Sequence, residues 1–178
     1  LYFMQITETP NEDLVLKAFD NQLQPSKQLH PDLLQPPFTL MMVGPKGSSK
    51  TTTILRLIYG NNKKKNSTNC YHKFYRHYFD KIYVFSPTWS NDAKTARCRI
   101  PDDQIFEDVE DYEEIIQQIL DGQEEDIRED GKEDADSILL IFSDLAGTKF
   151  YSNKKGILNK VAFNHRHYKV SVILDSQS

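Results

Sequence analysis

The sequence predicts an α/β fold in which helices cover both faces of a mostly parallel sheet. Four short apolar segments have the length and the Val, Ile, Leu and Phe content of buried strands. Helical segments separate them, so each strand is expected to return to the sheet through a right-handed crossover. Polar motifs follow three of the four strands, and ligands bind at the carboxyl ends of strands in such sheets. We therefore expect one domain with a site at that edge.

The chain alternates helix and strand signals in a definite order. The expected elements are a helix over 10–20, a connector over 24–37, a strand over 38–43, a helix ending near Tyr59, a strand over 81–86, a helix over 110–121, a strand over 138–142, a helix over 153–165 and a strand over 170–174. The strand over 38–43 is apolar apart from Thr39, which is typical of a central strand buried on both faces. Gly60 and Gly122 are expected to end the helices before them.

The same signals divide the chain. Residues 1–3 resemble the remnant of an engineered protease site, 4–36 are expected to form an N-terminal helix and connector, and 37–178 form the core. Within the core, 122–137 is expected to be an acidic, mobile segment. No apolar run of the sequence reaches the length of a membrane span, so we expect no membrane partner.

Charge is distributed unevenly along the chain. Residues 107–136 hold 15 of the 26 acidic residues and two of the 22 basic residues, so this stretch carries −13 and the remainder +9. A remainder of this charge is suited to phosphate backbones. The alternative is a solvated acidic insertion in an ordinary domain.

The stretch GPKGSSKT follows the first predicted strand and opens a helix, like a phosphate-binding loop. Backbone N–H groups of such a loop face a phosphate, the lysine reaches the β- and γ-phosphates, and the following hydroxyl is a magnesium ligand. The candidate nucleotide-binding residues are Gly44, Pro45, Lys46, Gly47, Ser48, Ser49, Lys50, Thr51 and Thr52. Ser49 replaces the second glycine of the pattern. A serine there costs about 1 kcal/mol or less if its φ is negative, and it is strained if its φ is positive. The alternative is a turn that only starts a helix.

Asp144 follows the third predicted strand. A carboxylate there is costly unless it serves a cation or a hydrogen-bond network, and magnesium bound to a nucleotide supplies the cation. Asp144 is therefore a candidate catalytic residue and, with Thr51, a candidate metal ligand. Two registers stay open: Ser143 replaces a metal-shell acid before Asp144, or Leu145 replaces a base after it. Either leaves one carboxylate short, and a capping aspartate is the simpler alternative.

Four segments together resemble the poxvirus-type viral DNA-packaging ATPases of the FtsK/HerA superfamily. They are FTLMMVGPKGSSKTT, KIYVFSPT, ILLIFSDLAG and the stretch from Asn164 to Gln177. The resemblance implies an ASCE P-loop NTPase with a three-layer αβα sandwich, ATP and Mg²⁺ as ligands, and double-stranded DNA as the substrate. It further implies a homo-oligomeric ring when the protein is full length, at a viral capsid vertex, in the host cytoplasm or the virion. These ATPases continue beyond the last strand, so we expect a truncated C-terminus.

The resemblance also implies two further catalytic residues. Gln177 takes the place of the glutamine that senses the γ-phosphate, and Arg166 is the candidate for an arginine supplied by a neighbouring subunit. The alternative is that Arg166 pairs with Asp175 or caps the helix over 153–165.

Nucleic-acid contacts are less defined. Lys63, Lys64 and Lys65 form a short cationic run, and residues 71–78 interleave basic and aromatic side chains. For 71–78 we favour aromatics that pack on the sheet. The sequence thus predicts an ATP-driven DNA translocase, with a non-catalytic nucleotide-binding or docking module as the alternative.

Overall fold

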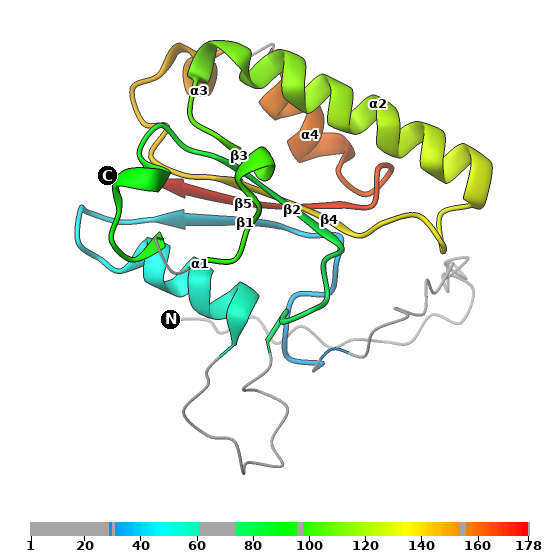
Figure 1. Cartoon of the computed structure of the whole chain (residues 1–178), viewed down its shortest axis with the longest axis horizontal. Helices are drawn as coiled ribbons and strands as arrows, with labels where there is room; N and C mark the ends of the chain where they lie inside the picture. The colour runs from blue at the N-terminus through cyan, green and yellow to red at the C-terminus, as the bar shows by residue number, and fades with distance from the viewer. Residues whose placement is uncertain (1–28, 30, 61–73, 96–97, 154–155, 178) are drawn as a thin grey trace, which may run out of the picture.

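The computed structural model describes residues 29, 31–60, 74–95, 98–153 and 156–177. Their five strands are β1 (Thr39–Val43), β2 (Lys81–Phe85), β3 (Ile105–Phe106), β4 (Ile138–Phe142) and β5 (Val170–Ser176). The α-helices are α1 (Lys50–Tyr59), α2 (Tyr112–Asp130), α3 (Lys149–Ser152) and α4 (Ile157–Asn164). All strand pairs are parallel and the order is β1-β5-β4-β2-β3, so the predicted α/β class is confirmed (Figure 1).

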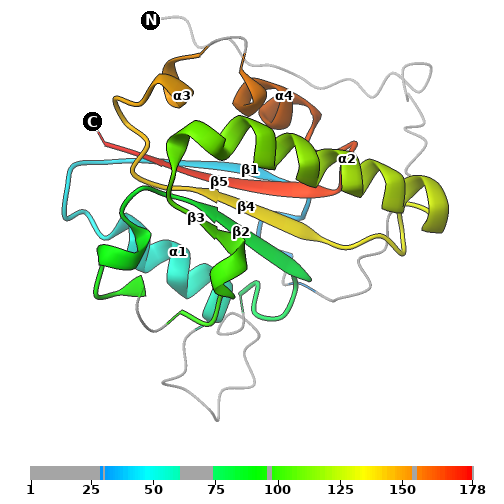
Figure 2. The same ribbon diagram turned by 45° about the horizontal axis from the view of Figure 1, so that its top comes forward.

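Helices lie on both faces of the sheet. Figure 2 shows α1 on one face and α2 with α4 on the other. Ile54 and Ile58 of α1 pack on the first face with Ile141 and Ile173. The second face is aromatic, with the rings of Phe85 and Phe142 stacked at a centroid distance of 5.1 Å, and α2 packs on it. Two apolar layers therefore hold the central strands from both sides.

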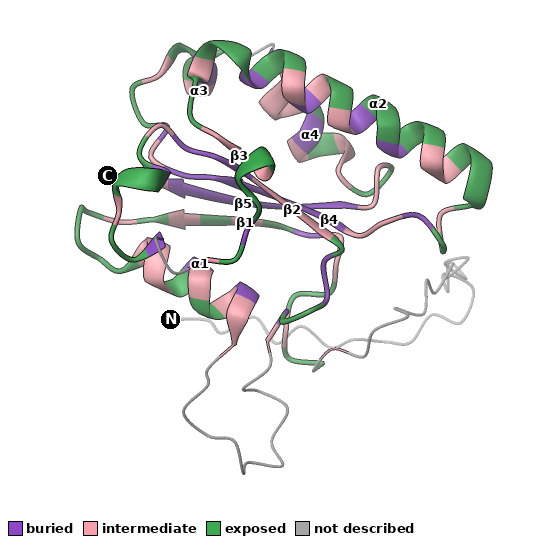
Figure 3. Ribbon diagram, viewed as in Figure 1, coloured by how far each residue is buried: buried purple, intermediate pink, exposed green. Residues whose placement is uncertain are grey.

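The prediction that the first strand is central is wrong. Among the described residues β1 lies at an edge of the sheet, paired only with β5. Its side chains alternate, so that Met41 and Val43 are 52% and 60% exposed while Leu40 and Met42 face the α1 layer. Figure 3 shows β1 in the colours of exposed and intermediate residues, whereas every residue of β4 is buried. Continuous apolarity identified a strand correctly, but it does not determine the strand's position in the order.

The acidic helix is longer than predicted. α2 continues through Gly122 to Asp130, so the predicted helix end at Gly122 is wrong, and the first part of the acidic segment 122–137 is helical. Gln123, directly after the glycine, is buried and its amide Nε2 donates to the Asp136 carbonyl at 2.7 Å. A glycine costs a helix about 1 kcal/mol, which this packing offsets.

Two other predicted segments differ in detail. The helix expected over 153–165 begins only at Ile157 and is preceded by the short α3. In the basic and aromatic stretch, Tyr75 and Tyr78 are buried against the α1 face, which confirms the packing interpretation for these two rings. Residues 1–3, the helix over 10–20 and Lys63 to Lys65 lie outside the described residues.

Candidate functional site

Three predicted segments meet at the carboxyl edge of the sheet. β5 lies between β1 and β4, with Val43 opposite Ser176 and Phe142 opposite Leu174. The Gly44 amide donates to the Ser176 carbonyl at 3.2 Å, so the loop after β1 starts beside the end of β5. In Figures 1 and 2 this loop and the C-terminus lie at the same end of the molecule.

The backbone of the loop requires small residues at defined positions. A Cβ at Gly44 would lie 2.9 Å from the Ser48 hydroxyl oxygen, and Gly47 has a φ of +84°. Ser49 has a φ of 66°, so of the two alternatives for this residue the strained one holds. Left-handed angles cost a non-glycine residue about 1–2 kcal/mol. Ser49 therefore stands at a position whose backbone geometry favours the glycine of the motif.

Lys50 is the first residue of α1, and its side chain folds back over the loop. The Nζ donates to the carbonyls of Gly44 at 2.8 Å and of Pro45 at 3.3 Å. Ser49 makes no side-chain cap and no acidic residue stands in the first turn of α1. The helix N-terminus and an ammonium group therefore point into one loop, an arrangement that suits an anion.

Asp144 is placed opposite this loop by the end of β4. Gln177 Nε2 donates to its Oδ1 at 2.8 Å, and the Thr88 hydroxyl donates to its Oδ2 at 2.8 Å. Asp144 also has a left-handed φ of 56°. The structure thus confirms that the polar residues after β4 and β5 lie together at this edge of the sheet. A residue held at unusual backbone angles by such contacts is characteristic of functional sites.

Asp175, a second carboxylate of this edge, was not predicted from the sequence as a site residue. It is 3% exposed, and its oxygens accept from the Ser143 hydroxyl at 2.7 Å and from the Asp144 amide at 3.0 Å. Asp175 thereby holds the backbone that carries Asp144. The signal for it was a carboxylate in a buried strand, which needs partners.

The residues on either side of Asp144 are both buried. Ser143 donates to Asp175, while Leu145 lies in the aromatic core on the opposite face. Asp144 therefore presents its carboxylate at this edge in either register, and the neighbouring Asp175 of β5 is buried. Thr88, also not predicted, comes from the turn after β2.

Arg166 is not part of this group. It lies in the turn before β5, at the opposite end of that strand from Gln177, and is exposed. The alternative pairing with Asp175 is wrong, because Asp175 bonds to Ser143 and Asp144 at the other end of β5.

The donor set at this edge is compatible with a magnesium nucleotide. Among the described residues no three His, Cys, Asp or Glu side chains gather into a metal site. Magnesium commonly takes one or two protein oxygens and completes its shell with phosphate and water, which the Thr51 hydroxyl and Asp144 can accommodate. The Lys50 ammonium and the loop amides are suited to the phosphates.

Comparisons with protein-family models, curated proteins and solved structures give no match for this chain. No helix in the described part of the chain combines the length and apolarity needed to cross a bilayer.

Proposed function

We propose that this chain binds ATP with Mg²⁺ at the loop over residues 44–51 and hydrolyses it at the carboxyl edge of the sheet. The observation that carries the proposal is the convergence of the Lys50 loop with the Asp144 and Gln177 pair. Lys50 would bind the β- and γ-phosphates, and Thr51 with Asp144 would hold the metal ion. Gln177, which is hydrogen-bonded to Asp144, would contact the γ-phosphate and so link its presence to the position of the carboxylate.

Nucleotide binding requires an exchange of partners in this site. Lys50 would release the Gly44 and Pro45 carbonyls in favour of phosphate oxygens. At Asp144, the metal ion or the attacking water would replace the hydroxyl of Thr88 or the amide of Gln177. The present bonds join the Lys50 ammonium to neutral carbonyls, whereas phosphate oxygens carry negative charge, and the added attraction between opposite charges favours the exchange at Lys50.

The biological role that we propose is ATP-driven translocation of double-stranded DNA during packaging of a viral genome. Its support is the resemblance of four sequence segments to viral packaging ATPases, together with an all-parallel sheet that has helices on both faces (Figure 2) and a loop that joins β1 to α1. This role includes a homo-oligomeric ring at the capsid vertex, in the host cytoplasm or the virion. Within the ring, Arg166 would act on the site of the neighbouring subunit.

A second candidate is a nucleotide-binding or docking module without turnover. The observation that favours it is that both carboxylate oxygens of Asp144 are already engaged, by Gln177 and Thr88. A carboxylate held in this way is less available to activate water.

Phosphate release measured with and without duplex DNA distinguishes the two candidates. The translocase predicts ATP turnover that rises when DNA is added and disappears in Asp144→Asn. The module predicts ATP binding by calorimetry with no turnover above the Asp144→Asn background under either condition. Absence of both binding and turnover would rule out a nucleotide at this loop.

A further inference from the structure

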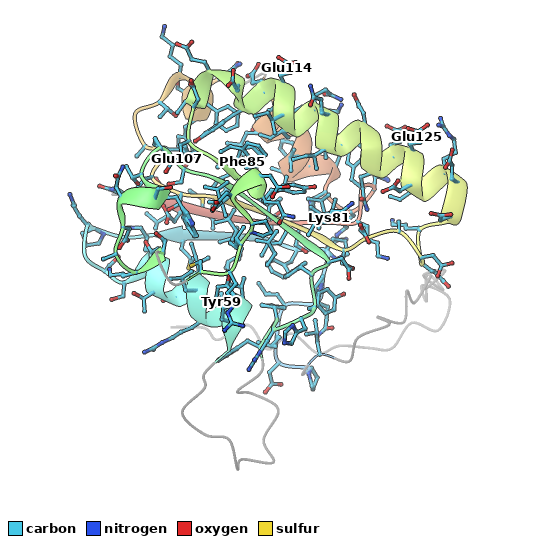
Figure 4. All side chains as sticks on the ribbon, in the orientation of Figure 1. Tyr59, Lys81, Phe85, Glu107, Glu114 and Glu125 are labelled. Carbon is cyan, nitrogen blue, oxygen red and sulfur yellow. The ribbon has the colours of Figure 1, made fainter. Side chains whose placement is uncertain are left out.

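A cavity of about 680 Å³ lies on the α1 face of the sheet, away from the candidate nucleotide site. Asp80 and Ile82, at the amino end of β2, line it, whereas the nucleotide loop lies at the carboxyl ends of the strands. Tyr59, at the C-terminal end of α1, lines another wall (Figure 4). α1 is about 15 Å long, so its N-terminal end lies at the loop over residues 44–51 and its C-terminal end lies at the cavity.

The lining of this cavity is strongly basic. It includes four Lys and Arg side chains and a single carboxylate, that of Asp80, although the whole chain carries a net charge of −4. Arg76 is already hydrogen-bonded through Nε to His77. The principal anion contacts therefore fall to Arg56 of α1 and to Lys94 and Arg99 of the segment before β3, all of which are exposed.

The other polar groups of the cavity do not cancel this charge. Burial raises the pKa of the Cys98 thiol to about 11 and also raises the pKa of the Tyr59 hydroxyl, so both are neutral at pH 7. The Tyr59 hydroxyl oxygen accepts from the Arg99 amide at 3.0 Å, which ties the loop with Arg99 to the end of α1. This hydrogen bond joins the loop that carries Arg99 to the helix that carries Arg56.

We propose that this basic cavity contacts the phosphate backbone of a nucleic acid. Its cations come from separate chain segments and are long, exposed side chains, which suits phosphates spaced along a strand. A compact triphosphate is better held by the converging backbone N–H groups of a helix N-terminus, whereas most of the α1 residues that line this cavity belong to the C-terminal half of the helix. The inference shares its DNA partner with the proposed function, but it does not require a nucleotide at the loop.

The test is the affinity of the chain for a 20-base-pair fluorescent duplex, measured by anisotropy over a range of salt concentrations without nucleotide. The cavity variant is Arg56→Gln with Arg99→Gln. Its matched control is Arg128→Gln with Lys149→Gln, which changes the net charge equally at exposed sites on α2 and α3. Because each phosphate contact contributes about 0.9 to the salt slope, we expect the cavity variant to lose about tenfold or more in affinity and about two units of slope.

The control variant should bind within about twofold of wild type, since its cations would not touch the duplex. Circular dichroism establishes that each variant is folded, and Lys94→Gln, at an exposed position, repeats the test with one charge if the double cavity variant is not. Equal losses in cavity and control variants, or no duplex binding by wild type, would overturn the inference. The inference would also be overturned if metal-free ATP lost affinity for the cavity variant while duplex affinity stayed unchanged. The ligand of the cavity would then be a free nucleotide. Calorimetry with ATP and Mg²⁺ tests the loop over residues 44–51 separately.

Discussion

The helices α1 and α2 lie on opposite faces of the same sheet, and their N-termini differ in chemistry. α2 carries Glu113 and Glu114 in its first turn, and the Asp108 carboxylate accepts from the Glu110 amide in the turn that precedes it. Figure 4 shows Glu114 on the outer side of α2. α1 has no acidic residue in its first turn and no side-chain cap at Ser49.

Both helices have the same partial positive charge at their start, but only α2 neutralises it with its own carboxylates. At α1 the same charge is joined by the Lys50 ammonium, at the sheet edge that also carries the Asp144 and Gln177 pair. The difference teaches that helix starts with the same partial charge can be neutralised by acidic residues of their own sequence or left open for an anion. The proposed nucleotide supplies that anion at α1.

The largest effect is expected from the carboxylate at the α1 site. Asp144→Asn keeps the size of the side chain but removes the charge needed to hold a metal ion or activate water. We expect turnover with duplex DNA to fall by about 100-fold or more, with ATP affinity changed only a few-fold. Phosphate release and calorimetry measure the two quantities. Asp108→Asn, the matched change near α2, should leave turnover unaltered, and wild-type turnover in Asp144→Asn would contradict the assignment.

A smaller effect is expected from the strained residue that opens α1. Ser49 has a left-handed φ, so Ser49→Gly should raise the free energy of unfolding by up to about 1 kcal/mol. Gly131, which follows α2, has a φ of +88°, so Gly131→Ala should lower it by about 1 kcal/mol. Urea denaturation measures both changes. A loss of stability in Ser49→Gly would show that this residue is not strained.

The course of α2 gives a comparable stability test. Gly122 lies in the helix interior, and no atom lies within 4 Å of the position that a Cβ would occupy there. Gly122→Ala should therefore raise the free energy of unfolding by about 0.5–1 kcal/mol. If the helix ended at Gly122 in a left-handed cap, alanine would instead destabilise the protein. The sign of the change in urea denaturation decides between the two.

The smallest effect tests the comparison of helix starts directly. Thr53→Glu would give the exposed start of α1 a carboxylate like those of α2, and Thr53→Gln is its uncharged control. The carboxylate should weaken ATP binding at low salt by about 0.3–1 kcal/mol relative to the control, or about two- to fivefold. Calorimetry at low and high salt checks this, because screening should shrink the difference. Equal affinities at low salt would mean that the field of α1 does not act on the ligand.

Much of the sheet and part of the site could be predicted from sequence. Strands of a parallel sheet are continuously apolar, so four of the five were located within one or two residues, and parallel pairing implied that Asp144 and Gln177 would meet. The two-residue β3 was not predicted, because a strand so short has no readable period.

The remainder depends on tertiary contacts that have no local signal. The order of the strands makes β1 an edge strand. It also brings Asp175 beside Ser143, although these two residues are far apart in the sequence. The left-handed angle of Ser49 is imposed by the loop around it, since serine itself prefers other conformations. Gly122 predicts a helix end, but α2 continues through it because Gln123 of the following turn is buried and hydrogen-bonded to Asp136.

Calorimetric titration of ATP with Mg²⁺ into wild type and Lys50→Ala tests the central claim most directly, namely that the loop before α1 binds a nucleotide. The matched control is Lys149→Ala, which removes an exposed cation of α3 outside this loop. Loss of a charge-assisted phosphate contact should weaken binding by about 2–3 kcal/mol, or roughly 30- to 150-fold, in Lys50→Ala and by no more than about twofold in Lys149→Ala. Equal affinity of wild type and Lys50→Ala, or no binding by wild type, would contradict the claim.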